Sequence, residues 1–227
     1  MDINYLLIGI FVPLICFLIG LYIFLKNPLK NFNFMFFIFT WFITIWAMLS
    51  YAFFLDQTNE LLYKIAFSLG GVCILTTIPW VLFLLNTDNK FLIRLPYIFS
   101  ALLVSVPFWD KWAMYNYVSD NNTYSYDTGI SYYFYVGIVL CAIVYLFYIL
   151  IKNLFVNDTN KKRIVLFVLI GYTIYISGEM YFGLILPVIN YTSSIPYDNV
   201  GALIFVVASA VGLMKYDKNL LTDSTII

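Results

Sequence analysis

Residues 65–86 read IAFSLGGVCILTTIPWVLFLLN and carry no charged side chain. An α-helix needs roughly 20 apolar residues to cross a hydrocarbon core about 30 Å thick. Further apolar runs lie on both sides of this one, at 4–25, 34–55, 92–109, 133–151, 164–187 and 199–214. In lipid such runs must be helices, because every backbone polar group has to be satisfied within its own segment.

The pattern therefore predicts an all-α membrane protein, a seven-transmembrane helical bundle over residues 1–218 with a short cytoplasmic tail at 219–227. The composition agrees, since 63% of the residues are hydrophobic and only 11% are charged. A membrane barrel is not expected, because its strands would be about ten residues long and would alternate between apolar and polar residues.

The basic residues indicate the orientation. The loops on one side of the predicted bundle hold ten of the twelve, and only Lys64 and Lys111 fall on the other side. Basic loops stay in the cytoplasm, so the amino terminus is expected outside and the carboxyl terminus inside. This asymmetry either serves topology alone or also makes the outer face attract cations. The ten residues are Lys26, Lys30, Lys90, Arg94, Lys152, Lys161, Lys162, Arg163, Lys215 and Lys218.

A bias toward Ile, Phe, Asn, Lys and Tyr suggests an AT-rich, bacterial genome. We therefore expect the bacterial inner membrane as the location, with the lipid bilayer as the main partner. No nucleic-acid partner is expected.

The outer loop near 110–132 is rich in aromatic residues. Tyr and Trp gather at the headgroup level of membranes, so an aromatic belt is one interpretation. A lid over an outward-facing pocket is the other, because loops of this length are often functional. The aromatic residues in and beside it are Trp109, Trp112, Tyr115, Tyr117, Tyr124, Tyr126, Tyr132 and Tyr133.

Glu179 is the one carboxylate deep in a predicted span, eight residues before Pro187. A carboxylate in that position is costly and is a candidate functional residue. Tyr175 and Tyr172 precede it on the same helix face. Glu179 either forms a structural hydrogen bond as the neutral acid, or binds a small ligand or a proton reached from outside.

A second polar face runs along the span at 34–55, where Thr40, Thr44, Ala47 and Tyr51 recur at steps of four, three and four. This face is expected to turn inward, away from lipid. The predicted ligand-binding residues are Glu179, Tyr175, Tyr172, Tyr51 and Thr44.

Small residues mark the last span, with Gly201, Ala208 and Gly212 on one face. Small residues let membrane helices approach closely, so this helix is expected to be tightly packed. Cys16, Cys73 and Cys141 are odd in number and irregular in spacing, which predicts neither a disulfide frame nor a zinc site. With no histidine in the chain, neither a metal nor a cofactor is expected.

Several seven-helix functions can be tested against the residues. A retinal protein needs a lysine in the middle of its last helix, and residues 199–214 contain none. The Asn-Pro-x-x-Tyr motif and the acidic-Arg-Tyr triplet of G-protein-coupled receptors are also missing. Catalytic groups are sparse, so the chain is not expected to be an enzyme. A small-solute transporter stays open, because Gly70 to Pro79 and Gly178 to Pro187 repeat one spacing.

Three stretches give the chain a likeness to a known family: 42–51 (FITIWAMLSY), 78–87 (IPWVLFLLNT) and the end from Ile195-Pro196 to Asp217. In these the chain resembles the amino-terminal seven-helix sensor region of bacterial histidine kinases. The resemblance implies a bundle that senses a signal and a last helix that passes it to a cytoplasmic output. No phosphoacceptor histidine or nucleotide-binding domain follows in the 227 residues, so two alternatives stay open. The chain is either a non-catalytic sensor module that acts through a separate kinase or another cytoplasmic partner, or a fragment of a longer kinase.

Overall fold

The computed structural model describes residues 7–87, 89–109, 114–120, 123–155, 158–181 and 197–216. Within these ranges, seven helices are long and apolar enough to cross a membrane. The prediction of an all-α seven-helix bundle is thereby confirmed, and the fold is that of a multi-pass membrane protein. The candidate spans are Ile8–Lys26, Asn31–Leu55, Glu60–Leu84, Lys90–Phe108, Ile130–Asn153, Thr159–Tyr181 and Asn199–Tyr216.

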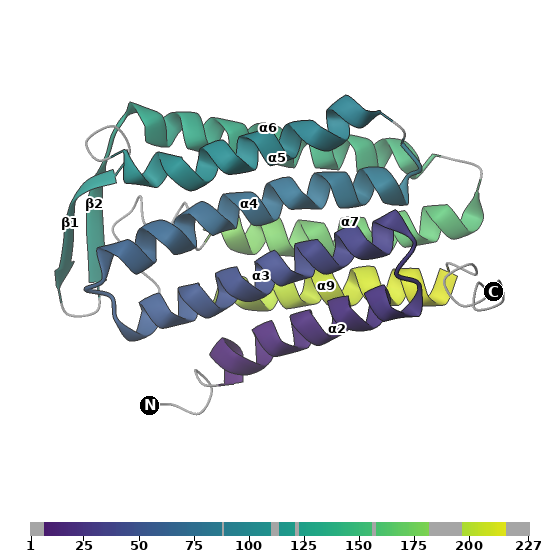
Figure 1. The fold of residues 1–227 in the computed structure, drawn as a ribbon, viewed down its shortest axis with the longest axis horizontal. Helices are drawn as coiled ribbons and strands as arrows, with labels where there is room; N and C mark the ends of the chain where they lie inside the picture. Colours follow the sequence, from purple (N-terminus) through teal and green to yellow (C-terminus); the bar gives the residue numbers. More distant parts are fainter. Residues whose placement is uncertain are drawn as a thin grey trace.

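The helices run alternately up and down the bundle, with a two-stranded hairpin at one end (Figure 1). We call this end the hairpin end. The elements in chain order are a π-helical turn η1 (Leu7–Phe11), α2 (Val12–Lys26), α3 (Asn31–Leu55), α4 (Glu60–Leu84), α5 (Lys90–Ser105), a short helix η2 (Val106–Phe108), β1 (Met114–Asp120), β2 (Thr123–Thr128), α6 (Ile130–Asn153), α7 (Thr159–Gly178) and α9 (Tyr197–Tyr216).

The opposite end of the bundle collects the basic residues, and we call it the basic end. Of the twelve lysines and arginines, Lys111 and Lys218 lie outside the described residues, which leaves ten. Nine of these ten lie at the basic end, and Lys64, in the first turns of α4, is the exception. The hairpin end has Asp56, Glu60 and Asp127 instead. The two ends therefore carry opposite net charge, as the loop pattern predicts.

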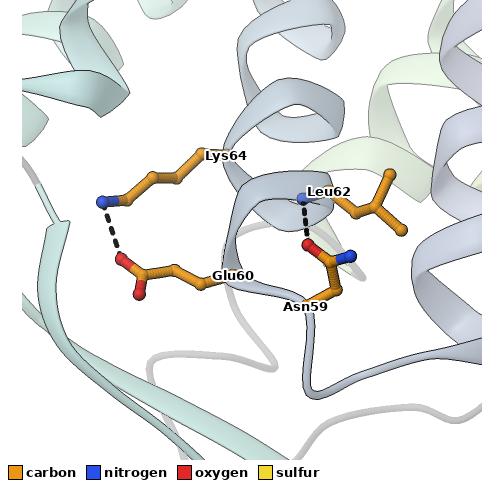
Figure 2. Close-up of polar contacts among 4 residues, drawn as sticks. All are labelled: Asn59, Glu60, Leu62 and Lys64. Atoms are coloured by element: carbon orange, nitrogen blue, oxygen red, sulfur yellow. Dashed lines mark hydrogen bonds and ion pairs between the residues drawn. The ribbon is translucent and has the colours of Figure 1, made fainter.

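Side-chain caps fix where three of the helices begin. The Asn59 side chain accepts a hydrogen bond from the Leu62 N–H at 3.1 Å, and one turn on Lys64 pairs with Glu60 at 2.7 Å (Figure 2). Asn89 caps α5 and Asp158 caps α7 in the same way. Such caps satisfy N–H groups that have no partner within the helix.

The basic end of α4 is closed by a left-handed cap. Asn86 has a φ of 55°, and the Thr87 N–H donates back to the Leu82 carbonyl at 2.9 Å. This is the Schellman arrangement, and asparagine tolerates the left-handed conformation it needs. The Lys161 ammonium of α7 then donates to the Leu85 carbonyl at 3.0 Å. A cation thus sits at the negative end of the α4 dipole and ties α4 to α7.

Lys161→Met is expected to lower stability by about 1 kcal/mol, because it removes a charge-assisted bond to a free helix carbonyl while keeping the aliphatic stem. The measurement is the midpoint of thermal unfolding in detergent. Lys162→Met is the matched control, since Lys162 is exposed. Equal effects of the two substitutions would show that Lys161 acts only through net charge.

The outer surface of the bundle is apolar along the spans. Leu18, Ile98, Val144 and Ile170 each lie within a span and are more than half exposed. Exposed apolar side chains along the spans suit a hydrocarbon environment and favour association in water.

The segment between α5 and α6 differs from the expected loop. Its described residues form an antiparallel hairpin in which Tyr115 faces Asp127 and Asp120 faces Thr123, with a register shift between Tyr115 and Val118. Alternating tyrosines favour strands, since aromatic residues suit a half-buried pleated surface. The aromatic content alone did not reveal this pairing. Trp112 lies outside the described residues.

Candidate functional site

The polar face of α3 is buried as predicted, since Thr40, Thr44, Ala47 and Tyr51 are all at most 8% exposed. Thr44 and Tyr51 on this face contact α2 and η1. The Thr44 hydroxyl lies within hydrogen-bonding distance of the Thr40 carbonyl (2.8 Å) and of the Pro13 carbonyl of α2 (3.2 Å). The Tyr51 ring lies directly against Gly9. These contacts give Thr44 and Tyr51 a role in packing α2 against α3.

Asn199, which no sequence pattern marked, joins α9 to α3. It is fully buried, and its side-chain amide donates to the Ala47 carbonyl at 3.4 Å. An asparagine at the first position of a predicted span is easily mistaken for a boundary residue. The structure shows Asn199 to be an interior polar group, because its side chain is fully buried.

Tyr172 and Tyr175 are also fully buried, but each packs on an aromatic ring of α9. The Tyr175 ring stacks on Phe205 at 5.7 Å between centroids, and Tyr172 meets the same ring edge-on at 5.6 Å. On its other side Tyr172 contacts Phe147 of α6 at 5.2 Å. Phe205 is therefore the centre of an aromatic cluster that the α7 sequence alone did not reveal.

Trp80 extends this aromatic cluster to α3 and α4. Its indole lies 5.0 Å from the Phe36 ring, 5.9 Å from Phe39 and 6.0 Å from Phe205. Aromatic pairs at these separations contribute about 0.5–1.5 kcal/mol each beyond their buried area. One connected set of rings therefore joins α3, α4, α6, α7 and α9 at the centre of the bundle.

The Tyr135 hydroxyl of α6 forms hydrogen bonds with two backbone groups of α4. It donates to the Phe67 carbonyl at 2.7 Å and accepts from the Gly71 N–H at 3.0 Å. These two groups are four residues apart, so they are the pair that a regular α-helix would bond to each other. A side chain inserted at this point is a known cause of helix bending. Gly71 makes the approach possible, because an ideal Cβ there would come within 2.4 Å of the hydroxyl.

Glu179 follows the last regular turn of α7 and opens a π-helical turn over 179–181. Its own N–H still donates to the Tyr175 and Ile176 carbonyls. The residue is half-buried, and its carboxyl group lies within electrostatic range of Cys73 of α4 and Tyr135 of α6. The expected continuation of this helix to Pro187, on which its depth was based, lies outside the described residues. Widened π turns occur frequently at functional sites.

The structure thus brings together part of the predicted site. Glu179 lies one turn from Tyr175 and within electrostatic range of Tyr135, a residue that no sequence pattern marked. Thr44 and Tyr51 instead lie against α2 and η1. The candidate site is therefore Glu179, Tyr175 and Tyr135 together with the Phe67–Gly71 segment of α4.

A second aromatic cluster holds the hairpin on the bundle. The Tyr117 hydroxyl donates to the Gln57 carbonyl in the α3–α4 turn at 2.5 Å. The Tyr63 ring of α4 lies 5.9 Å from Tyr117 and 5.3 Å from Tyr126. Tyr126 also approaches Tyr132 at the start of α6, at 6.2 Å. These tertiary contacts attach the hairpin to the beginning of α4 and α6.

The hairpin is expected to detach from the bundle at strongly alkaline pH. Burial raises the pKa of the Tyr117 hydroxyl to about 12 from an ordinary value of 10.0, and the Glu60 and Asp56 carboxylates add to the effect. A pKa raised on folding stabilises the docked form below pH 10 and loses that contribution as the pH rises through 12. Fluorescence of a dye at Val118→Cys should report release in this window. The change in fluorescence over this pH range should be smaller in Tyr117→Phe. An unchanged fluorescence response would contradict the assignment to Tyr117.

The described residues contain no group of three or more His, Cys, Asp or Glu side chains that could hold a metal ion. Cys16 and Cys73 are buried free thiols, and Cys141 is free and exposed. Buried thiols of this kind behave as small apolar residues. Neither a protein-family model nor a curated protein matches the chain, so its own residues and geometry are the basis for assigning a function.

Proposed function

We propose that the chain is a membrane-embedded, non-catalytic sensor module, with the hairpin end outside the bacterial inner membrane and the basic end in the cytoplasm. The orientation is supported by the nine basic residues at one end, since basic segments stay cytoplasmic. The resemblance of 42–51, 78–87 and 195–217 to the sensor region of histidine kinases supports the same class.

One observation carries the proposal: the Glu179 carboxyl group lies within electrostatic range of Tyr135, whose hydroxyl forms two hydrogen bonds with the backbone of α4. With Tyr135 in place, the Phe67 carbonyl and the Gly71 N–H bond to the hydroxyl. With Tyr135 withdrawn, they would bond only to each other, so the proposal gives α4 two alternative arrangements. A ligand or proton at Glu179 that prefers one of them shifts the population toward it. The ligand is a small molecule or proton reached from the hairpin end.

The output helix in this proposal is α9. Its small residues lie against α7, where an ideal Cβ on Gly201 would stand 3.3 Å from the Tyr175 Cα. At the basic end, the Arg163 guanidinium of α7 lies 5.3 Å from the Tyr216 ring, and Phe167 lies 6.0 Å from it. A displacement of α7 at Glu179 would therefore be passed to α9, and through α9 to a cytoplasmic signalling partner.

The orientation predicts which positions an impermeant thiol reagent labels in intact cells. In a background without the three native cysteines, Val118→Cys at the hairpin should be labelled from outside, and Thr159→Cys at the start of α7 should not. Both positions are exposed on the protein, so access from the medium decides the result. Labelling of Thr159→Cys without Val118→Cys would reverse the orientation and overturn an outward-facing sensor.

Glu179→Gln separates a sensing carboxylate from a structural one. Glutamine keeps the shape and hydrogen-bonding capacity but cannot ionise, so the unfolding midpoint should stay within a few degrees of the wild type. Signal output should nevertheless become constant, measured with a histidine-kinase body fused after Lys218. Regulated output from the Glu179→Gln variant would reduce Glu179 to a structural role.

A small-solute transporter is the second candidate, because two helices carry interruptions that transporters commonly use at their sites. Pro79 lies inside α4 in addition to the Tyr135 insertion, and Pro96 lies inside α5. Broken helices often line transporter binding sites. Solute uptake by vesicles containing the purified chain, abolished by Glu179→Gln, would favour transport over sensing.

A further inference from the structure

The centre of the bundle contains three polar side-chain groups that the mechanism above does not use. The Trp80 indole N–H, the Tyr172 hydroxyl and the Ser209 hydroxyl are all buried, and none of them has a hydrogen-bond partner among the described residues. All three residues are 0% exposed. Buried polar groups nearly always have a partner, in the protein or in an ordered water molecule.

The three residues that carry these groups are neighbours of Phe205 in α9. The Trp80 and Tyr172 rings contact Phe205 from α4 and α7, at 6.0 and 5.6 Å. Ser209 lies one turn after Phe205, and residues four apart share a helix face. Phe36, Phe39 and Phe147, which pack on Trp80 or Tyr172, have no carbonyl or hydroxyl in their side chains to offer.

We propose that ordered water is bound at the centre of the bundle around Phe205 and bridges Trp80, Tyr172 and Ser209. The chemistry of the groups selects this ligand. An indole N–H can only donate, whereas each hydroxyl can donate and accept, so the bridging molecule must supply both donors and acceptors. Water does so in the smallest volume, and buried waters typically make about three hydrogen bonds. The result is a polar link between α4, α7 and α9 within an aromatic core.

Magnetisation transfer from water to the five ¹⁵N-labelled indole groups tests this proposal in the wild-type chain in nanodiscs. The Trp80 signal should show a direct water contact although the residue is fully buried. Single Trp→Phe replacements at 41, 46, 109 and 112 assign the other four signals, so Trp80 is identified even if Trp80→Phe does not fold. Absence of a water contact at Trp80 would overturn the proposal.

Thermal unfolding tests whether the three groups share the water. Tyr172→Phe and Ser209→Ala should each lower the unfolding midpoint by roughly 2–4 °C, and their effects should not add, because either change breaks the same bridge. Tyr148→Phe, which removes the hydroxyl of an exposed tyrosine on α6, is the matched control and should have no effect. If the core is dry, both substitutions remove an unsatisfied group and the midpoint should rise, which would also overturn the proposal. The test does not depend on whether the chain is a sensor or a transporter.

Discussion

Replacing Gly171 with leucine is expected to separate α7 from α9 and to cost several kcal/mol, or to prevent folding. An ideal Cβ at this position already lies 3.0 Å from the Phe205 Cα and 3.0 Å from the Ala208 Cβ. The contact with the Phe205 Cα is with backbone, which cannot rotate away. Overpacking a well-packed core typically lowers the free energy of unfolding by about 1–3 kcal/mol even where side chains can move. Thermal unfolding and the yield of monodisperse protein measure the effect.

Gly137→Leu is the matched control for this substitution. An ideal Cβ at Gly137 has no atom within 4 Å, so a larger side chain there should be tolerated. If Gly171→Leu were as stable as Gly137→Leu, the close approach of α7 and α9 would be wrong.

Gly71→Ala is expected to destabilise the fold by about 3 kcal/mol through Tyr135. The added methyl group would expel the hydroxyl from its place between Phe67 and Gly71, leaving a buried polar group without its partners at a cost of about 1–3 kcal/mol, with overpacking strain in addition. The gain of about 1 kcal/mol from alanine in a helix is too small to compensate. Gly137→Ala is the matched control. An added methyl group there meets no atom within 4 Å, so this variant should show only the gain in stability from alanine in a helix.

The combination of Gly71→Ala with Tyr135→Phe identifies the cause. Phenylalanine removes the oxygen that the methyl group would meet, so the double variant should recover part of the lost unfolding midpoint. A double variant that loses the sum of the two single effects would contradict the insertion of Tyr135 into α4.

The sequence predicted the membrane fold well because hydropathy reports directly on the bilayer. The predicted spans agree with the described helices to within a few residues. The starts of α4 and α7 shift most: α4 is predicted from 65 and begins at Glu60, and α7 is predicted from 164 and begins at Thr159. In both cases a polar cap, Asn59 or Asp158, extends the helix into a polar segment. The close packing of Gly201, Ala208 and Gly212 was also predictable, because small residues on one face have few other uses.

The candidate site was only partly predictable, because its partners are set by tertiary contacts. Glu179 stood out as a charge in an apolar segment. Tyr135, by contrast, is one of 20 tyrosines, and nothing in its neighbours along the chain indicates that its hydroxyl enters another helix. Thr44 and Tyr51 were correctly predicted to face inward, but periodicity does not say which helix lies opposite, and that helix is α2.

The coupling between Glu179 and the far end of α9 is tested most directly by a distance measurement in nanodiscs. Spin labels at Lys90 and Lys215, both exposed at the basic end, report the position of α9 against α5, and labels at Lys90 and Lys152 provide a reference pair. Double electron–electron resonance should give a shifted Lys90–Lys215 distance in Glu179→Gln, because the carboxylate biases the α4–α7 arrangement, with the reference distance unchanged. Identical Lys90–Lys215 distributions in the wild-type protein and the Glu179→Gln variant would contradict transmission from the hairpin end to the basic end.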